Sequence, residues 1–128
     1  MNNKLQSIVI DWIPSQSKVV DFGCGDGALL KMLAESKSVT GYGVENDPNK
    51  INACIINRVP VIQQDIDAGI QNYRDMGFDV AIMASSIQCL RRPRDAMTNI
   101  LKVANECVIT LPNFGNWELR VGLLKGKM

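Results

Sequence analysis

The sequence predicts an α/β fold, a doubly wound, Rossmann-like parallel sheet of five strands in the order 3-2-1-4-5. Two observations support this prediction. Short apolar or β-branched runs alternate along the chain with segments of helical period. The first predicted strand, residues 18–22, also runs directly into a loop with glycine at three alternate positions, Gly23, Gly25 and Gly27. We expect the loop to lie beside the switch point between strands 1 and 4, where open α/β sheets bind ligands.

Length and composition agree with one ordinary globular domain. The chain has 128 residues, of which 46% are hydrophobic and 21% charged, enough for a single core. The net charge is +1 and no long basic run occurs, so we expect no nucleic-acid partner. No apolar run is long enough to cross a bilayer, and the N-terminus lacks the apolar region of a signal peptide. We therefore expect a cytoplasmic protein without a membrane partner.

The chain has no histidine, and its cysteines are scattered, at Cys24, Cys54, Cys89 and Cys107. No Cys-x-x-Cys pair occurs, so we expect no metal site and interpret the cysteines as packed thiols. The absence of histidine removes the Ser-His and Cys-His nucleophile systems. No residue is assigned a catalytic role.

The first half of the chain has clear local signals. Apolar residues at steps of three and four predict a helix over residues 3–13, which Pro14 ends. A helix from about Asp26 to Glu35 follows the glycine loop, and residues 40–45 form the second strand. Glycines are unusual inside a strand, so Gly41 and Gly43 indicate close backbone contact there.

The second half continues the alternation. Asn46-Asp47-Pro48 signals a helix start, and the helix ends near Arg58. Residues 59–63, 78–84 and 106–111 are the remaining strands, and residues 93–104 form the helix before the last one. The strand at 78–84 is nearly all apolar, as expected for a central strand buried on both faces. Residues 112–128 are interpreted as a loop and a mildly amphipathic helix.

The charges around the glycine loop indicate its ligand. Gly23, Gly25 and Ala28 formally match a dinucleotide fingerprint, whose pyrophosphate would lie at the helix N-terminus. Asp21 and Asp26 would repel a pyrophosphate, whereas they suit the ammonium and sulfonium of S-adenosylmethionine. The alternative for Asp26 is a helix N-cap, which is physically sound as well.

Two other strand ends supply carboxylates at the same edge of the sheet. Glu45 can accept both hydroxyls of a ribose. Asp65 can accept from the amino group of an adenine, on which Ile66 packs; its alternative role is the N-cap of a helix over residues 67–73. The complete predicted cofactor site consists of Asp21, Gly23, Cys24, Gly25, Asp26, Gly27, Glu45, Asn46, Asp65, Ile66, Ala84 and Ser85. Cys24 can also be a small residue that merely fits the turn.

The sequence also resembles a known family. The run at 19–27, Val-Val-Asp-Phe-Gly-Cys-Gly-Asp-Gly, resembles motif I of class I S-adenosylmethionine-dependent methyltransferases. The segments at 41–45, 61–67 and above all 111–117, Leu-Pro-Asn-Phe-Gly-Asn-Trp, are similar to the MetW family of methionine-biosynthesis proteins, over nearly the whole chain. This resemblance implies the methyltransferase fold, S-adenosylmethionine or S-adenosylhomocysteine as cofactor, and action beside a homoserine O-acyltransferase.

Methyltransferases of this class usually continue through two more strands, the last one antiparallel. This chain is expected to stop soon after strand five, as a C-terminally truncated form. Two functions remain open at this point. One is an accessory subunit of the acyltransferase, with a docking surface near Phe114, Trp117, Leu119 and Leu123. The other is a free-standing methyltransferase acting on a small molecule or a protein.

Overall fold

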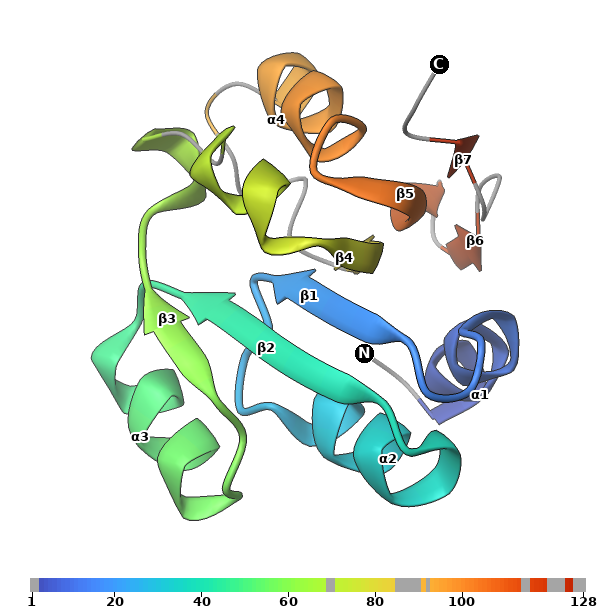
Figure 1. Ribbon diagram of the computed structural model, residues 1–128, viewed down its shortest axis with the longest axis vertical. Helices are drawn as coiled ribbons and strands as arrows, with labels where there is room; N and C mark the ends of the chain where they lie inside the picture. Colours follow the sequence, from blue (N-terminus) through green and yellow to red (C-terminus); the bar gives the residue numbers. More distant parts are fainter. Residues whose placement is uncertain are drawn as a thin grey trace.

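The computed structural model describes residues 3–68, 71–84, 91, 93–113, 116–119 and 124–125. Its elements alternate as the sequence predicts, and Figure 1 shows how they are arranged. In chain order they are α1 (Asn3–Trp12), β1 (Lys18–Phe22), α2 (Ala28–Lys37), β2 (Thr40–Glu45), α3 (Pro48–Ile56), β3 (Val61–Gln63), the 3-10 turns η1 (Ile66–Ala68) and η2 (Gln71–Met76), β4 (Phe78–Met83), α4 (Pro93–Ile100), β5 (Ala104–Asn113), β6 (Asn116–Leu119) and β7 (Leu124–Lys125).

The sheet has the predicted topology. Its parallel part runs β3-β2-β1-β4-β5, and the change of direction falls between β1 and β4. Asp21, near the end of β1, has Gly43 of β2 and Ile82 of β4 as its register partners. The carboxyl ends of β1, β2 and β3 therefore lie at one edge, where the glycine loop begins.

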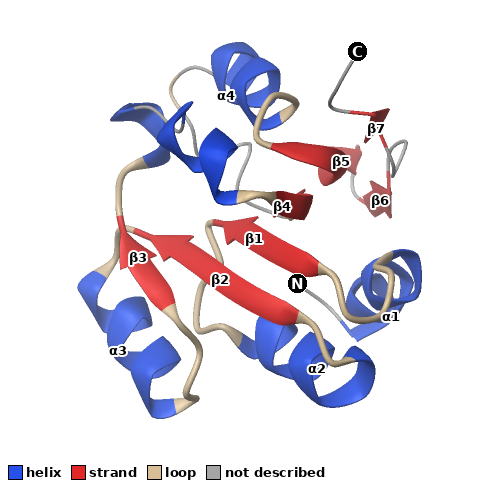
Figure 2. Cartoon of the chain, in the orientation of Figure 1, coloured by secondary structure: helices blue, strands red, loops and turns tan. Residues whose placement is uncertain are grey.

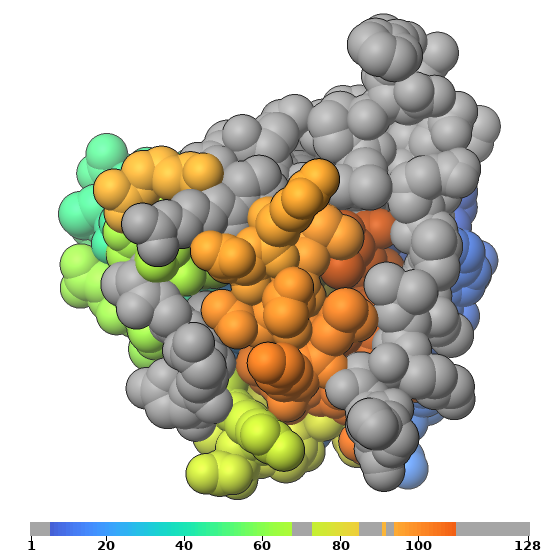
Figure 3. All heavy atoms as spheres, turned by 90° about the horizontal axis from the view of Figure 1, so that it is seen from above, coloured from blue at the N-terminus to red at the C-terminus, as the bar shows by residue number. Residues whose placement is uncertain are grey.

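Helices cover both faces of the sheet, as Figures 1 and 2 show: α2 and α3 lie on one face, and α4 lies on the other. Figure 3 looks onto the face that α4 covers. The pleat of the strands divides the apolar residues between two core clusters. The cluster on the α2 side includes Val19, Val80, Ile82, Leu30 and Leu33, and the cluster on the α4 side includes Val20, Phe22, Ala81, Met83 and Ile100.

The glycines of β2 let α2 and the loop approach the strand, which confirms the expected close contact. A Cβ on Gly41 would lie 2.7 Å from Cδ2 of Leu30. A Cβ on Gly43 would overlap the Cys24 side chain. Both positions require glycine, because α2 and the loop before it pack directly on this strand.

A lysine fixes α1 to the rest of the domain. The Nζ of Lys37, at the end of α2, donates to the carbonyls of Ile10 at 2.5 Å and Ile13 at 2.7 Å. These carbonyls lie at the end of α1, where helical partners run out and a cation is favourable. Val9 and Ile13 are fully buried. The helix therefore covers the sheet beside β1 and brings Gln6 close to the glycine loop.

Three expectations need correction. The helix after the loop begins at Ala28 instead of Asp26, because Gly23, Gly25 and Gly27 all have positive φ. The helix before β5 ends at Ile100 instead of residue 104. Residues 101–103 form a turn that leads into the strand.

The third correction concerns residues 112–128, where we expected a loop and a helix. The described part forms strands: β5 extends to Asn113, and β6 and β7 both pair with β5 in antiparallel orientation. The chain thus adds strands beyond the five expected. In the predicted docking surface, Phe114 and Leu123 lie outside the described residues, as do the side chains of Trp117 and Leu119. Among the helices of the described residues, none is long and apolar enough to cross a membrane.

Candidate functional site

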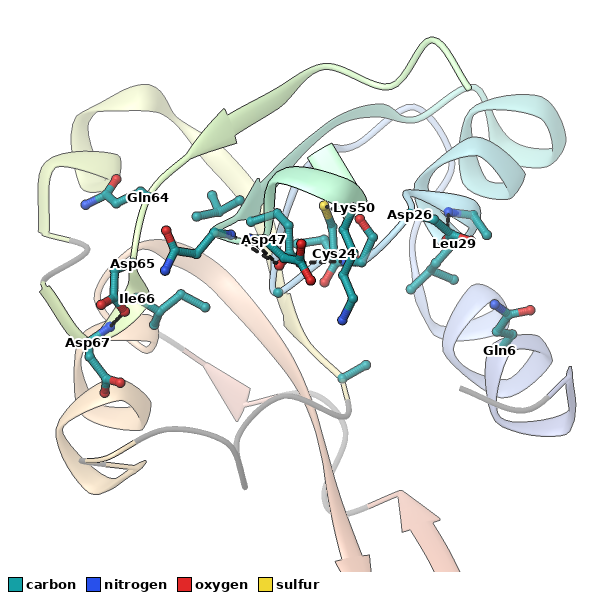
Figure 4. Close-up of a pocket in the computed structure, with 18 residues that line it drawn as sticks. Gln6, Cys24, Asp26, Leu29, Asp47, Lys50, Gln64, Asp65, Ile66 and Asp67 are labelled. Atoms are coloured by element: carbon teal, nitrogen blue, oxygen red, sulfur yellow. Dashed lines mark hydrogen bonds between the residues drawn. The ribbon is translucent and has the colours of Figure 1, made fainter. Parts of the chain in front are cut away.

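A cavity of about 580 Å³ opens at the carboxyl edge of the sheet, a volume typical of small-molecule sites. Figure 4 shows that it lies between the segment after β3 on one side and α1 with the start of α2 on the other. Its lining residues are Gln6, Asp21, Gly23, Cys24, Gly25, Asp26, Ala28, Leu29, Val44, Glu45, Asn46, Asp47, Lys50, Gln64, Asp65, Ile66, Asp67 and Ala84.

The glycine loop is held against β2 by backbone hydrogen bonds and packs on the segment that follows α3. The amides of Gly23 and Cys24 both donate to the carbonyl of Val44, at 2.8 and 3.2 Å. Gly27, with φ +82°, is the N-cap of α2, and a Cβ there would lie 3.0 Å from Val59. Glycine is required at position 27 because the left-handed conformation and the close packing both exclude a side chain.

Glu45 connects the loop to the end of β2. Its Oε1 accepts from the amide of Gly25 at 2.9 Å, and its Oε2 accepts from the amides of Asn46 at 3.2 Å and Asp47 at 3.1 Å. A carboxylate has about four acceptor positions, so roughly one remains for a ligand. Glu45 therefore organises the site as well as lining it, a structural role that the sequence did not indicate.

Asp26 and Asp47 sit at the starts of helices. Oδ1 of Asp26 accepts from the amide of Ala28 at 3.0 Å, so the carboxylate satisfies the first free N–H of α2 although Gly27 is the N-cap. Asp47 is the N-cap of α3 and accepts from the amide of Asn49 at 2.9 Å, which confirms the predicted helix start.

Side-chain hydrogen bonds hold the other wall of the cavity. Oδ1 of Asp65 accepts from the amide of Asp67 at 3.0 Å, so it caps η1 instead of a helix over residues 67–73. The Asp67 carboxylate accepts from the backbone amide of Arg91 at 3.2 Å and lies 3.5 Å from its Nε. The Tyr73 hydroxyl donates to Oε1 of Gln64 at 2.5 Å.

Asp21 differs from the other acids of the cavity. It is only 4% exposed, and its Oδ1 is buried with no hydrogen-bond partner among the described residues. Burial, and secondly the charge of Glu45, raise its pKa to about 8. At neutral pH the empty cavity therefore holds Asp21 mostly in its neutral form, which removes part of the repulsion that the sequence predicted between Asp21 and a pyrophosphate.

Cys24 and Cys54 meet beneath the loop, with their sulfur atoms 3.7 Å apart. The Cys54 thiol donates to the carbonyl of Gly25 at 3.1 Å. Burial raises the pKa of both thiols, so they pack as neutral groups. Cys24 packs against Gly43, as a small residue that fits the turn would, and it also lines the cavity.

The cavity is strongly acidic. Its described lining has six carboxyl groups and one cationic side chain, Lys50 of α3, which the sequence analysis missed. Lys50 lies in the first turn of α3, directly after the Asn46-Asp47-Pro48 segment, which the sequence marks as a helix start and not as part of a site. Within the described part of the chain, no group of three His, Cys, Asp or Glu residues could hold a metal ion.

The structure gathers most of the predicted cofactor residues into this one cavity. Ten of the twelve line it, all except Gly27, which supports the loop from behind, and Ser85, which lies outside the described residues. The prediction missed Gln6, Ala28, Leu29, Val44, Asp47, Lys50, Gln64 and Asp67. The helix-start signal at Asn46-Asp47-Pro48 could have found Asp47. Gln6 reaches the cavity only through long-range packing of α1.

A comparison with protein families decides the classification. The model of the family described as "Methionine biosynthesis protein MetW" matches residues 4–128. The chain belongs to the MetW family. It is similar to the "Bifunctional methionine biosynthesis protein MetXA/MetW" of Rhodopirellula baltica, with 28% identity over 120 residues. That match covers 88% of this chain and 19% of the relative, so the chain spans about a fifth of the relative's length.

Solved structures with the same fold include proteins described as methyltransferases. A TehB-like SAM-dependent methyltransferase from Corynebacterium glutamicum has a TM-score of 0.71 at 20% identity, over 88% of this chain and 65% of that one. The N-terminal domain of EvdMO1 with SAH bound has a TM-score of 0.71 at 15% identity, covering 84% and 48%. The [4+2]-cyclase SpnF has a TM-score of 0.73 at 21% identity, covering 84% and 43%. The MetW-family chain thus has the class I methyltransferase fold.

Proposed function

We propose that this protein binds S-adenosylmethionine or S-adenosylhomocysteine in the acidic cavity and acts as an accessory subunit of a homoserine O-acyltransferase in methionine biosynthesis. The observation that carries the ligand assignment is the cavity itself, in which the glycine loop, Glu45 and Asp65 meet at the carboxyl edge of the sheet. Membership of the MetW family carries the link to methionine biosynthesis.

The charges favour a cationic adenosyl ligand over a dinucleotide. A pyrophosphate at the start of α2 would meet Asp26 and Glu45, with Lys50 as the one cationic side chain in the described lining. An ammonium and a sulfonium are attracted by the same carboxylates. The remaining acceptor position on Glu45 suits a ribose hydroxyl, and Ile66 supplies an apolar surface for an adenine. A bound SAH in the EvdMO1 domain, which shares the fold, supports this choice.

The relative from Rhodopirellula baltica supports the choice of partner. Its name joins a MetXA part and a MetW part in one chain, and this protein covers only 19% of it. Fusion keeps two parts at high effective concentration, which is useful when they act together. We infer that this chain associates with a separate acyltransferase in the same way, and that both are cytoplasmic.

An accessory role is favoured over an independent methyltransferase by what lines the cavity. The described lining contains acids, amides, one lysine, one cysteine and small or aliphatic residues, and the buried thiol of Cys24 is kept neutral. The fold alone does not imply methyl transfer, since the [4+2]-cyclase SpnF shares it. A free-standing methyltransferase remains the competing proposal, because positioning and desolvation can suffice for that reaction.

The deciding experiment pairs the protein with the homoserine O-acyltransferase of its own organism. Complex formation is followed by sedimentation, and acyltransferase activity is measured with and without S-adenosylmethionine. We expect a stable complex whose activity changes by about five-fold or more with the ligand, as allosteric coupling commonly gives. The Glu45→Gln variant should weaken this response, whereas Glu35→Gln, on the exposed surface of α2, should preserve it.

Two results would contradict the proposal. The accessory role is wrong if no complex forms while the protein alone methylates a metabolite at an ordinary enzymatic rate, about 1 s⁻¹ or faster. The ligand assignment is wrong if calorimetry shows tight binding of NAD and no heat from S-adenosylmethionine or S-adenosylhomocysteine.

A further inference from the structure

Asp21 is a buried carboxyl group whose hydrogen-bonding capacity is unused. It lies in the wall of the cavity with 4% of its surface exposed, and Oδ1 has no partner among the described residues. Its register neighbours, Gly43 and Ile82, offer no polar side chain. Buried polar atoms are almost always paired, so an unpaired carboxyl oxygen on a residue that lines a cavity indicates a group that is completed by a ligand.

The charged and titratable groups around Asp21 are mostly acidic. β2 contributes Glu45, the loop contributes Cys24 and Asp26, and α3 contributes Cys54 and Lys50, all at the cavity or directly behind it. The described part of β4 contributes apolar Ile82, with Ala84 just after it. Lys50 is exposed and lies at the cavity from α3, so within the described part of the chain no buried cation neutralises Asp21.

These surroundings favour the neutral form of Asp21 in the empty protein. Burial and Glu45 raise its pKa to about 8, so that at pH 7 roughly nine molecules in ten carry the proton. A positive charge placed in the cavity acts in the opposite direction, because a nearby cation stabilises the carboxylate. The empty cavity and the cavity that holds a cation therefore differ in the protonation of Asp21.

We propose that Asp21 carries a proton in the empty cavity and releases it when a positively charged ligand enters, so that occupancy of the site depends on pH. The proton passes to water, and the Asp21 carboxylate then pairs with the ligand's cationic group. This inference rests on the proposed function, in which the ligand is S-adenosylmethionine. It adds a link between the cell's pH and the ligand signal that reaches the acyltransferase.

The sign of the effect follows from the protonation states. Below pH 8 the ligand must displace a proton, so each unit of acidification weakens binding up to ten-fold until Asp21 is protonated in both states. Above pH 8 Asp21 is already ionised, and this dependence disappears. A ligand that lacks any positive charge gains nothing from the ionised carboxylate and should release no proton.

The test is titration calorimetry between pH 6 and 8 in buffers of different ionisation enthalpy, which counts the protons released on binding. The probes are S-adenosylmethionine, S-adenosylhomocysteine, which lacks the sulfonium charge, and 5′-methylthioadenosine, which lacks both cationic groups. We expect close to one proton released per S-adenosylmethionine at pH 7 by the wild type, and none from Asp21 with 5′-methylthioadenosine. Whether S-adenosylhomocysteine releases a proton identifies which cationic group Asp21 contacts.

The Asp21→Asn variant isolates the contribution of Asp21 at pH 6 to 6.5, where the amino group of the ligand, with a pKa of about 8, is protonated both free and bound. The variant should release close to one proton fewer and lose the corresponding pH dependence of affinity. Asp75→Asn, an exposed acid on η2 outside the cavity, is the matched control and should behave as wild type.

Equal proton release by wild type and Asp21→Asn, with S-adenosylmethionine bound tightly by both, would overturn this inference and leave the proposed function intact. Failure of all three probes to bind at any pH would overturn both.

Discussion

The two walls of the cavity are built in different ways. The loop wall, residues 21–29, is fixed to β2 and to the segment after α3: two amides bind the Val44 carbonyl, the Gly25 amide binds the Glu45 carboxylate, and Gly27 packs on Val59. The opposite wall, residues 64–67, is fixed at two side chains: Gln64 accepts from the Tyr73 hydroxyl, and Asp67 accepts from the backbone amide of Arg91. The close packing at Gly27 and Gly43 leaves no room for a side chain, whereas the exposed Arg91 side chain of the opposite wall is replaceable. We therefore expect the loop wall to determine both stability and ligand binding.

The pH dependence of stability gives the largest expected difference between the walls. Folding raises the pKa of Asp21 from 3.8 to about 8, so the folded state keeps a proton that the unfolded state loses above pH 4. Stability supplied by this group therefore falls as pH rises from about 4 to 8. Relative to Asp21→Asn, the wild type should lose up to about 1.4 kcal/mol per pH unit between pH 5 and 7, measured by urea unfolding. Equal slopes for the wild type and Asp21→Asn would contradict this expectation.

The loop wall should also dominate ligand affinity. Glu45→Gln replaces an acceptor that holds the amides of Gly25, Asn46 and Asp47, and it removes the charge offered to a ribose. Charge-assisted hydrogen bonds contribute roughly 1.5–3 kcal/mol, so the dissociation constant of S-adenosylmethionine should rise about 10- to 100-fold. Glu35→Gln, an exposed acid on α2, is the calorimetric control. An unchanged dissociation constant for Glu45→Gln would show that Glu45 does not contact the ligand.

A steric substitution tests the packing behind the loop wall. The Cβ of Gly43→Ala would overlap Cys24, and overpacking of this kind costs about 1–3 kcal/mol. The free energy of unfolding, from denaturant titration, should fall by this amount. Cys24→Ala makes room for the new methyl group, so the double variant should recover part of the loss. Additive effects of the two substitutions would show that the strand and the loop are not coupled.

The smallest effect is expected on the opposite wall. The Arg91 side chain is 78% exposed and its Nε lies 3.5 Å from Asp67, while its backbone amide also donates to Asp67. Arg91→Ala keeps that amide and loses an exposed ion pair, which typically contributes 0–1 kcal/mol. We expect unfolding free energy and ligand affinity to change by less than about 1 kcal/mol, as for Arg94→Ala on α4. A larger loss would show that the two walls are equally constrained.

The same difference explains what the sequence could predict. The loop wall follows from local signals, because the strand, the glycines and the helix are consecutive in the chain, and Glu45 ends the next strand. The opposite wall depends on pairings that no sequence motif marks: Asp67 accepts from the backbone amide of Arg91, and Gln64 accepts from the Tyr73 hydroxyl. Asp65 and Ile66 were predicted from the end of a strand, but Gln64 and Asp67 were not.

The errors at the C-terminal end have a related cause. Residues 112–128 carry apolar residues without a clear strand period, and their pairing with β5 is not local. The later start of α2 has a local cause. Gly27 adopts the left-handed conformation, so the helix cannot begin before Ala28. The neutral state of Asp21 follows from its burial, which no local sequence signal indicates.

The most direct test of this account is a crystal structure of the protein with S-adenosylhomocysteine. We expect the adenosine in the cavity between the two walls, with a ribose hydroxyl within hydrogen-bonding distance of Glu45 and the adenine against Ile66. Ligand density elsewhere on the molecule, or an empty cavity in crystals grown at saturating ligand, would contradict the assignment of this cavity as the cofactor site.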